Sequence, residues 1–394
     1  MTVDGKNLRA PAGPDLGLNT AEEARARVLH HDSIIVDLLA QHIGGSNLFL
    51  NFPATLLSDL HSRTKVMQGI EALTETEYWP YEMARQGKSD QIQQWYRSSG
   101  LTCGTYCIGV HDGADPDCLK LDQVNTVLSA LPWLRCVTTA EEIRRAKRDG
   151  VTALYAHWQP VNPAPRNLGA IDAAYGKGLR SFMLTYNQMD NIGVGCTERV
   201  DAGLSLFGVS VVHHCNDIGL IVDVSHCGYQ TTLDACRHSR KPVNANHTAA
   251  RGVFAHARGK SDEELKAIAD TGGVIGVVAL PAFLTADPVP HINHMLEHID
   301  YIANLIGWQH VALGTDWPMQ VPMELVARTL EVGTQALGFR PEHRLDWRVR
   351  LEGYEDGRDL VNITRGLVAR GYRDEQIQGI LGENALRVFA EVCD

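Results

Sequence analysis

The feature of this sequence that most limits its fold is an alternation of short apolar runs with helical segments, from about residue 100 to residue 318. The apolar runs are TCGTYCIGV, VTALYAHW, LRSFMLTYN, LIVDVSH, KPVNANH, VIGVVAL and HVALGTDWP, with an earlier candidate in SIIVDLLA. Strand and helix repeated with short connections is the pattern of parallel β/α units. Seven or eight such units, with no GxGxxG after the first strand, predict a (β/α)8 TIM barrel of the α/β class rather than a doubly wound sheet.

The segments outside this alternation complete the predicted domain organisation. Residues 1–20 are predicted to form an N-terminal arm, and residues 21–394 a single barrel domain with a helical C-terminal tail. Residues from about 44 to 100 are interpreted as an insertion over one face, because they begin with Gly, Asn and Pro and continue as a polar helical stretch with aromatic residues. The sequence leaves open whether this insertion is a lid or a dimer contact.

Composition and charge restrict the class of protein. A chain of 394 residues with 44% hydrophobic residues can bury a substantial core. The formal net charge of -11 and the lack of a Lys/Arg-rich block argue against nucleic acid as a partner. No run approaches the ~20 apolar residues that span a bilayer, and the N-terminus has no signal-peptide pattern, so no membrane partner is predicted. The 9 scattered cysteines lack CxxC pairs, which favours reduced thiols in the cytoplasm.

Chemically active side chains stand at the ends of successive predicted strands, where the active site of such a barrel lies. His226 and His247 end consecutive strands and Asp316 ends the last one. Either histidine alone is more often a hydrogen-bonded residue than a ligand, but the three together favour a metal site with Asp316 as a base. His157 could complete the ligand set. The strand's period of two leaves open whether His157 or Trp158 faces the barrel axis.

Long ordered blocks cover roughly residues 140–390. They are GLRSFMLTYNQMDNIGVG, DAGLSLFGVSVVHHCNDIGLIVDVSHCG, PVNANHTAARGVFAHARGKSDEELKAIADTGGVIGV, HIDYIANLIGWQHVALGTDWP and ITRGLVARGYRDEQIQGILGENALRVF. These blocks resemble the membrane (renal) dipeptidase family, peptidase family M19 of the amidohydrolase superfamily. The resemblance implies a metal-dependent barrel, usually dimeric, that hydrolyses dipeptides and related small amides. It places His226 and His247 at metal-ligand positions, Asp316 at the catalytic aspartate, and Arg258 where the family binds the substrate's carboxylate.

The sequence departs from the family pattern at three positions. Leu39-Ala40-Gln41 stands where the family has a metal-binding His-x-Asp, and the bridging Glu is absent from the end of VTALYAHW, where His157, Trp158 and Gln159 stand instead. Tyr186 occupies the place of a His that polarises the scissile carbonyl. Because two divalent ions a few ångströms apart repel unless anionic ligands lie between them, one metal ion is predicted instead of two.

These observations favour a dipeptidase-like hydrolase that acts on a dipeptide or another small carboxylate-bearing amide. The expected cofactor is one divalent metal ion, with zinc as the first choice. The expected metal ligands are His226, His247, Asp316 and His157, the catalytic residues Asp316 and Tyr186, and the substrate contacts Arg258, Tyr186 and Trp158. In this hypothesis Tyr186 donates to the developing oxyanion. A homodimer is expected from the resemblance alone.

Two other functions remain open. A lyase, isomerase or tautomerase on the same barrel could work without metal, because Tyr186, Asp316 and a histidine suffice for proton transfer next to a carbonyl. A non-catalytic binder of small ligands is disfavoured, because unused buried polar groups tend to cost stability.

Overall fold

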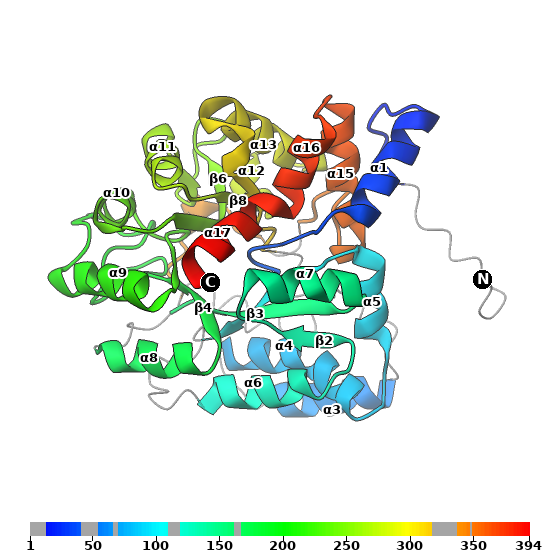
Figure 1. Ribbon diagram of the computed structural model, residues 1–394, viewed down its shortest axis with the longest axis horizontal. Coiled ribbons are helices and arrows are strands. Elements are labelled where there is room, and N and C mark those ends of the chain that lie inside the picture. The colour runs from blue at the N-terminus through cyan, green and yellow to red at the C-terminus, as the bar shows by residue number, and fades with distance from the viewer. Residues whose placement is uncertain are drawn as a thin grey trace.

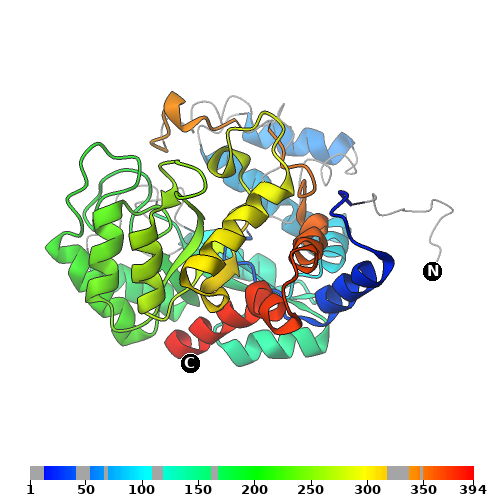
Figure 2. The same cartoon turned by 90° about the horizontal axis from the view of Figure 1, so that it is seen from above.

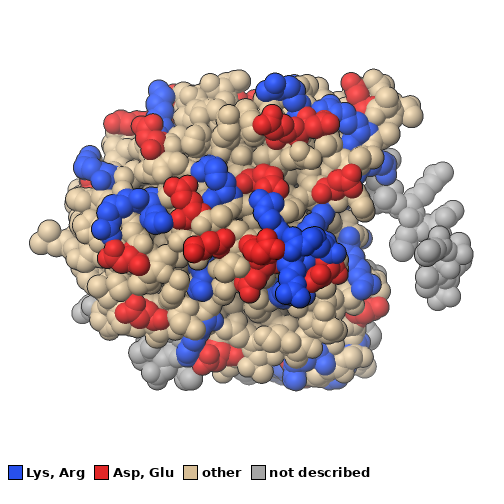
Figure 3. All heavy atoms as spheres, viewed as in Figure 1, with Lys and Arg blue, Asp and Glu red and all other residues tan. Residues whose placement is uncertain are grey.

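The computed structural model describes residues 13–40, 54–65, 70–108, 119–160, 167–316, 337–346 and 349–394. A curled sheet lies inside a layer of helices, as two perpendicular views show (Figures 1 and 2). In these residues no helix is both long enough and apolar enough to cross a membrane. On the face seen in Figure 3, the described Lys and Arg side chains are interspersed with Asp and Glu, without a continuous basic stripe.

Parallel strands form the central sheet in the order β1-β3-β4-β5-β6-β8-β9. They are β1 (Cys103–Ile108), β3 (Thr152–Trp158), β4 (Leu179–Met183), β5 (Ile221–Asp223), β6 (Val243–Ala250), β8 (Ile275–Val277) and β9 (Val311–Leu313). Two short strands flank this order, since β2 (Leu134–Cys136) pairs with β3 and β7 (Gly259–Lys260) pairs with β6.

The sheet closes through a two-residue segment near the N-terminus. Val36 bridges to Cys103 in β1, and Asp37 bridges to Leu313 in β9, both in parallel. This segment is therefore the first barrel strand, and with the seven strands of the main order it gives the eight of a (β/α)8 barrel. The predicted fold class is confirmed.

Helices follow the strands along the chain as the alternation predicts. Around the barrel lie α6 (Leu119–Ser129), α7 (Ala140–Asp149), α8 (Leu168–Gly176), α9 (Leu206–Ile218), α10 (Tyr229–His238), α11 (Asp262–Asp270), α12 (Pro281–Leu284) and α13 (Ile292–Ile306). Local sequence sets their ends: Thr139 with Glu142 forms a capping box at the start of α7, and Gly150 ends α7 in the left-handed conformation.

Segments before and after the alternation are also helical. The N-terminal region contains α1 (Thr20–Asp32), α3 (Ala54–Thr64), α4 (Ile70–Arg85) and α5 (Gln91–Ser99). The tail is helical as predicted, with α15 (Leu360–Ala369), α16 (Asp374–Gln378), the π-helical segment η4 (Gly379–Glu383) and α17 (Asn384–Cys393). Before it lie the 3-10 turns η1 (Trp308–His310), η2 (Pro341–His343) and η3 (Gly357–Asp359). Residues 1–12 of the predicted arm and residues 41–53 lie outside the described residues, and the proposed division into arm, insertion and barrel stays a prediction.

Two glycines allow β8 and the end of β9 to pack against the backbone of β6. A Cβ atom at Gly276 would lie 1.9 Å from the carbonyl oxygen of Asn246, and one at Gly314 would lie 1.7 Å from the same oxygen. Both distances are far inside van der Waals contact, and the obstacle is backbone rather than a movable side chain. Closure of the barrel next to His247 therefore requires glycine at both positions.

Gly314→Ala is expected to lower the melting temperature, with a loss of at least ~1–3 kcal/mol of stability from overpacking. The matched control is Gly176→Ala, because a Cβ there meets no heavy atom within 4 Å. Thermal unfolding of both variants checks the prediction. Equal melting temperatures for Gly314→Ala and the wild type would show that the strands can separate at no cost.

Candidate functional site

His226 follows β5 in the loop toward α10, His247 lies within the neighbouring strand β6, and their rings meet. Their Nε2 atoms are 2.9 Å apart. Asn187 donates from its amide nitrogen to the Leu337 carbonyl, so its Oδ1 faces His226 Nδ1 at 2.7 Å and must accept a proton from it. The lone pair of His226 is thereby assigned to Nε2, on the side of His247.

Both imidazoles are neutral. Burial, with the nearby positive charge of Arg258 as the next cause, holds the pKa of His226 and of His247 well below the ordinary histidine value. Neutral imidazole is the form that ligates metals and accepts protons.

The carboxylate of Asp223 holds the two histidine-bearing segments together. Its Oδ1 accepts from the backbone N–H of Ser225 at 2.9 Å and from that of Asn246 at 2.9 Å. The Ser225 hydroxyl donates to the same oxygen and accepts from the backbone N–H of His247 at 2.9 Å. Each residue that precedes a histidine is thus bound to one carboxylate oxygen, which fixes the ends of β5 and β6 relative to each other.

A second buried aspartate, Asp37, joins two backbone segments where β9 meets the first strand. Asp37 Oδ1 accepts from the backbone N–H of Leu39 at 3.0 Å and of Thr315 at 2.9 Å, and the Thr315 hydroxyl donates to Oδ2. Burial raises the pKa of the Asp37 carboxyl, against the hydrogen bonds from Thr315. The next residue, Asp316, donates its backbone N–H to the Leu39 carbonyl at 2.9 Å.

Asp316 has a left-handed backbone, with φ 52°. This conformation is uncommon for a residue other than glycine and persists only when neighbours hold it in place. Here Asp37 binds the preceding residue and Leu39 binds the Asp316 backbone. The backbone that carries the predicted catalytic carboxylate is therefore held where β9 meets the first strand.

Tyr186 joins the histidine pair by stacking. Its ring lies 4.0 Å from the His226 ring at an interplanar angle of 20°. Burial, and to a lesser degree the charge of Asp316, raises the pKa of the Tyr186 phenol. The hydroxyl is therefore protonated at neutral pH and can donate a hydrogen bond.

Strand β3 places His157, and not Trp158, inside the barrel. His157 Nδ1 lies 3.0 Å from the Ser181 hydroxyl, and Nε2 lies 3.6 Å from Asp223 Oδ2. Trp158 points to the other face, where its ring packs edge-on against Phe182 at 5.5 Å. Contact between Trp158 and a substrate inside the barrel finds no support in this placement.

Gln159 is the side chain of this segment that reaches the histidine pair. Its amide nitrogen lies 3.5 Å from His247 Nε2. In the sequence, Gln159 is notable only because it stands near the position of the absent bridging Glu. Side chains alternate between the two faces along a strand, so Gln159 shares the inner face with His157.

Arg258 is buried, with 1% of its surface exposed. Its guanidinium donates to the backbone carbonyl of Ser225 and, at 3.2 Å, to that of His247. The structure therefore gives Arg258 main-chain partners on both histidine segments, and its role as a carboxylate anchor stays a prediction.

The predicted four-residue metal set is not assembled. Among the described residues, no three His, Cys, Asp or Glu side chains converge in a way that could hold a metal ion. His226 and His247 meet, whereas His157 binds Ser181 and lies beside Asp223. The residue of this segment that faces the pair is Gln159, two positions after His157. Leu39 is fully buried at the end of the first strand, and Gln41 lies outside the described residues.

The side chains present fit one metal ion better than two. Two neutral imidazole nitrogens and the Gln159 amide supply only uncharged donors, whereas paired divalent ions need an anion between them. A catalytic zinc ion commonly has three protein ligands. His226 and His247 supply two of these, and Gln159, whose amide nitrogen is the atom near His247, supplies an oxygen as the third only after its amide flips.

Residues 24–328 match the family model of the membrane dipeptidases, peptidase family M19. The chain belongs to this family, which confirms the resemblance seen in the sequence blocks and the classification as a hydrolase.

Individual proteins and solved structures are also similar to this chain. Over 204 residues the chain is 31% identical to an uncharacterised protein in the pqqA 5' region of Klebsiella pneumoniae, a match that covers 49% of this chain and 75% of that protein. A solved amidohydrolase from Pseudomonas aeruginosa superposes with a TM-score of 0.72 at 26% identity, over 93% of this chain and 99% of that one. A metallopeptidase from Rhodobacter sphaeroides, liganded with a phosphinate mimic of the dipeptide L-Ala-D-Ala, gives a TM-score of 0.61 at 18% identity over 92% and 100%.

Ser225→Ala is expected to destabilise the protein by about 1–3 kcal/mol, because the buried N–H of His247 loses its acceptor. Ser210→Ala is the matched control, since the Ser210 hydroxyl is exposed and donates only within α9. Denaturant unfolding of both variants measures the difference. Equal stabilities would show that the Ser225 hydroxyl does not couple β5 to β6.

Proposed function

We propose that this protein hydrolyses the amide bond of a dipeptide or another small carboxylate-bearing amide with the help of one divalent metal ion, zinc being the first candidate. The observation that carries the proposal is the 2.9 Å approach of two neutral imidazole nitrogens at the mouth of a barrel of the dipeptidase family. The phosphinate mimic of L-Ala-D-Ala bound to the Rhodobacter sphaeroides metallopeptidase supports dipeptides as the first substrates to test.

Each residue has a definite task in this proposal. His226 and His247 would hold the ion, with the Gln159 amide oxygen as a neutral third donor. When bound, such an ion supplies Lewis acidity toward an amide carbonyl and toward water. Asp316 takes the proton of the attacking water and returns it to the leaving amine nitrogen. The Tyr186 hydroxyl donates to the oxygen on which negative charge develops.

A second candidate is an enzyme that transfers protons without a metal. It is favoured by the uncharged donors at the histidine pair and by the position of Tyr186 against His226. A lyase, isomerase or tautomerase would need only Asp316 or a histidine as the base and Tyr186 as the acid. The same metal analysis separates the two candidates.

The localisation, oligomeric state and partners of the protein are also proposals. We expect a cytoplasmic homodimer that takes a small-molecule substrate and has neither a nucleic-acid nor a membrane partner. Light scattering of the purified protein tests the dimer.

The proposed metal site predicts about one ion per chain after purification without chelator. His226→Ala and His247→Ala should each lose the ion, because the single imidazole that remains in each variant is not enough to hold it. His213→Ala is the control, since His213 is exposed on α9. Mass spectrometry of the metal content makes the comparison. A wild-type protein that stays metal-free after incubation with Zn2+ and Mn2+ would contradict the proposal and favour the second candidate.

Asp316→Asn is expected to lower kcat for dipeptide hydrolysis by about 10²–10⁴-fold, because the amide cannot accept the proton of water. The metal content of this variant should equal that of the wild type. Steady-state kinetics on a panel of dipeptides and N-acyl amino acids gives the measurement. Wild-type kcat in this variant would remove Asp316 from the proton-transfer role.

A further inference from the structure

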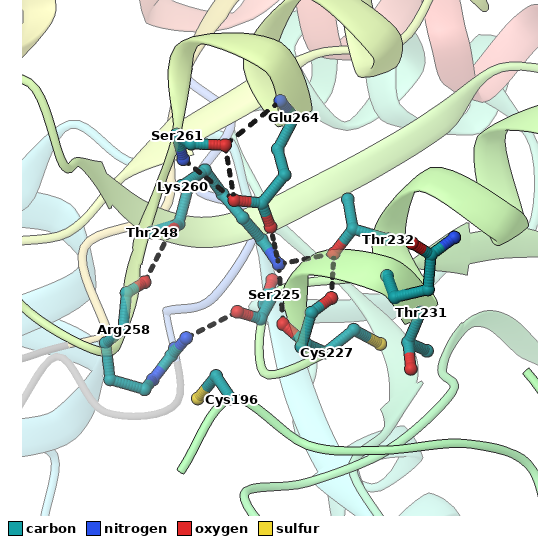
Figure 4. A network of polar contacts seen from close by, with 12 residues as sticks. Cys196, Ser225, Cys227, Thr231, Thr232, Thr248, Arg258, Lys260, Ser261 and Glu264 are labelled. Atoms are coloured by element: carbon teal, nitrogen blue, oxygen red, sulfur yellow. Dashed lines mark hydrogen bonds and ion pairs between the residues drawn. The ribbon is translucent and has the colours of Figure 1, made fainter. Parts of the chain in front are cut away.

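Two buried cations near β7 reach the loop that carries His226. Arg258 immediately precedes β7 and Lys260 ends it, with 1% and 2% of their surfaces exposed. Figure 4 shows Arg258 pointing toward Ser225 and Lys260 pointing toward Cys227. The guanidinium donates to the Ser225 carbonyl, and the Lys260 ammonium donates to the Cys227 carbonyl at 2.7 Å. The peptide carbonyls on both sides of His226 are therefore held by cations two residues apart.

The other donors of Lys260 connect this loop to two helices. Its ammonium also donates to the Thr232 hydroxyl in α10 at 2.7 Å, and it pairs with Glu264 in α11 at 3.2 Å. All three N–H groups of the ammonium thus have acceptors. Glu264 is itself fixed, because it accepts from the backbone N–H and the hydroxyl of Ser261 at 2.8 Å each.

Stability alone does not account for this ion pair. Both partners are at most 2% exposed, and among the Lys or Arg ion pairs of the described residues no other is as deeply buried on both sides. Removing two charges from water costs several kcal/mol per ion, and apolar replacements of such pairs are often neutral or stabilising. What the pair adds here is a directed ammonium at the Cys227 carbonyl.

We propose that Lys260 is a positioning residue for His226. With Glu264 as its counter-ion, it holds the Cys227 carbonyl while Arg258 holds the Ser225 carbonyl. The loop between them then has one conformation, in which His226 Nδ1 meets Asn187 and Nε2 meets His247. The consequence for metal binding rests on the proposed function, whereas the orientation of the His226 ring does not.

The test uses full-length Lys260→Met/Glu264→Gln, a double variant that leaves neither charge alone in the interior. The readout is the ring ¹H–¹⁵N spectrum of His226 in metal-free protein, assigned through His226→Gln. The wild type should show one tautomer with the proton on Nδ1, and the double variant should show shifted or averaged ring signals. Lys241→Met is the control, because Lys241 also donates to a main-chain carbonyl, that of Glu391, but at the surface.

Zn2+ titration of the same proteins supplies the second readout, with an expected 10–100-fold loss of affinity in the double variant. Unchanged His226 ring signals in a folded double variant would overturn the proposal. Changed ring signals, together with a wild type that binds no Zn2+, would support the positioning role and reject the proposed metal site. If the double variant does not fold, Lys260→Gln, which keeps a donor toward Glu264, undergoes the same measurement with the same criteria.

Discussion

The candidate site depends on one carboxylate oxygen beneath it. A (β/α)8 barrel gathers its strand ends at one mouth, but it does not by itself fix two imidazoles at hydrogen-bonding distance. Asp223 Oδ1 takes three donors, two from Ser225 and one from Asn246, and these residues directly precede the two histidines. In the dry interior such charge-assisted bonds are strong and directional. The geometry of the histidine pair follows from them.

Other buried charges at this mouth are likewise bound to main chain. Asp37 binds the backbone at Leu39 and Thr315, and Arg258 and Lys260 bind the carbonyls around His226. Among the described residues, the Gln159 amide and the Tyr186 ring contact the pair, and both are uncharged. A site that has exchanged anionic ligands for neutral ones stabilises less positive charge. This balance is the physical reason for proposing one metal ion rather than two.

The sequence was sufficient to predict the barrel and the proximity of His226 and His247, whereas their role as metal ligands stays a prediction. Parallel strands require apolar runs and crossover helices, and both leave periodic patterns. The run SIIVDLLA was less informative: only Val36 and Asp37 form bridges, because the Asp37 side chain binds Leu39 N–H and turns the chain there. An aspartate inside the apolar run LIVDVSH was a signal for Asp223 that pattern reasoning did not use.

The sequence could not predict which side chains of β3 face the barrel interior, because both faces of a fully buried strand carry apolar residues. In TALYAHW every residue is buried, so composition does not distinguish inside from outside. Register decides it: His157 pairs with Ser181 and Trp158 with Phe182, which puts the polar pair in the barrel and the aromatic pair outside. Gln159 then falls on the inner face, where its amide lies next to the histidine pair.

Arg258 shows how far a family position determines a role. A guanidinium has five N–H donors, and here one donates to the Ser225 carbonyl and another to that of His247. Its Nε–H has no hydrogen-bond partner among the described residues, although the atom is buried. A buried donor without an acceptor is costly, so this N–H is the part of Arg258 best suited to an incoming carboxylate. The terminal nitrogens of this side chain thus hold both histidine segments, and a contact of its Nε–H with a substrate carboxylate stays a prediction.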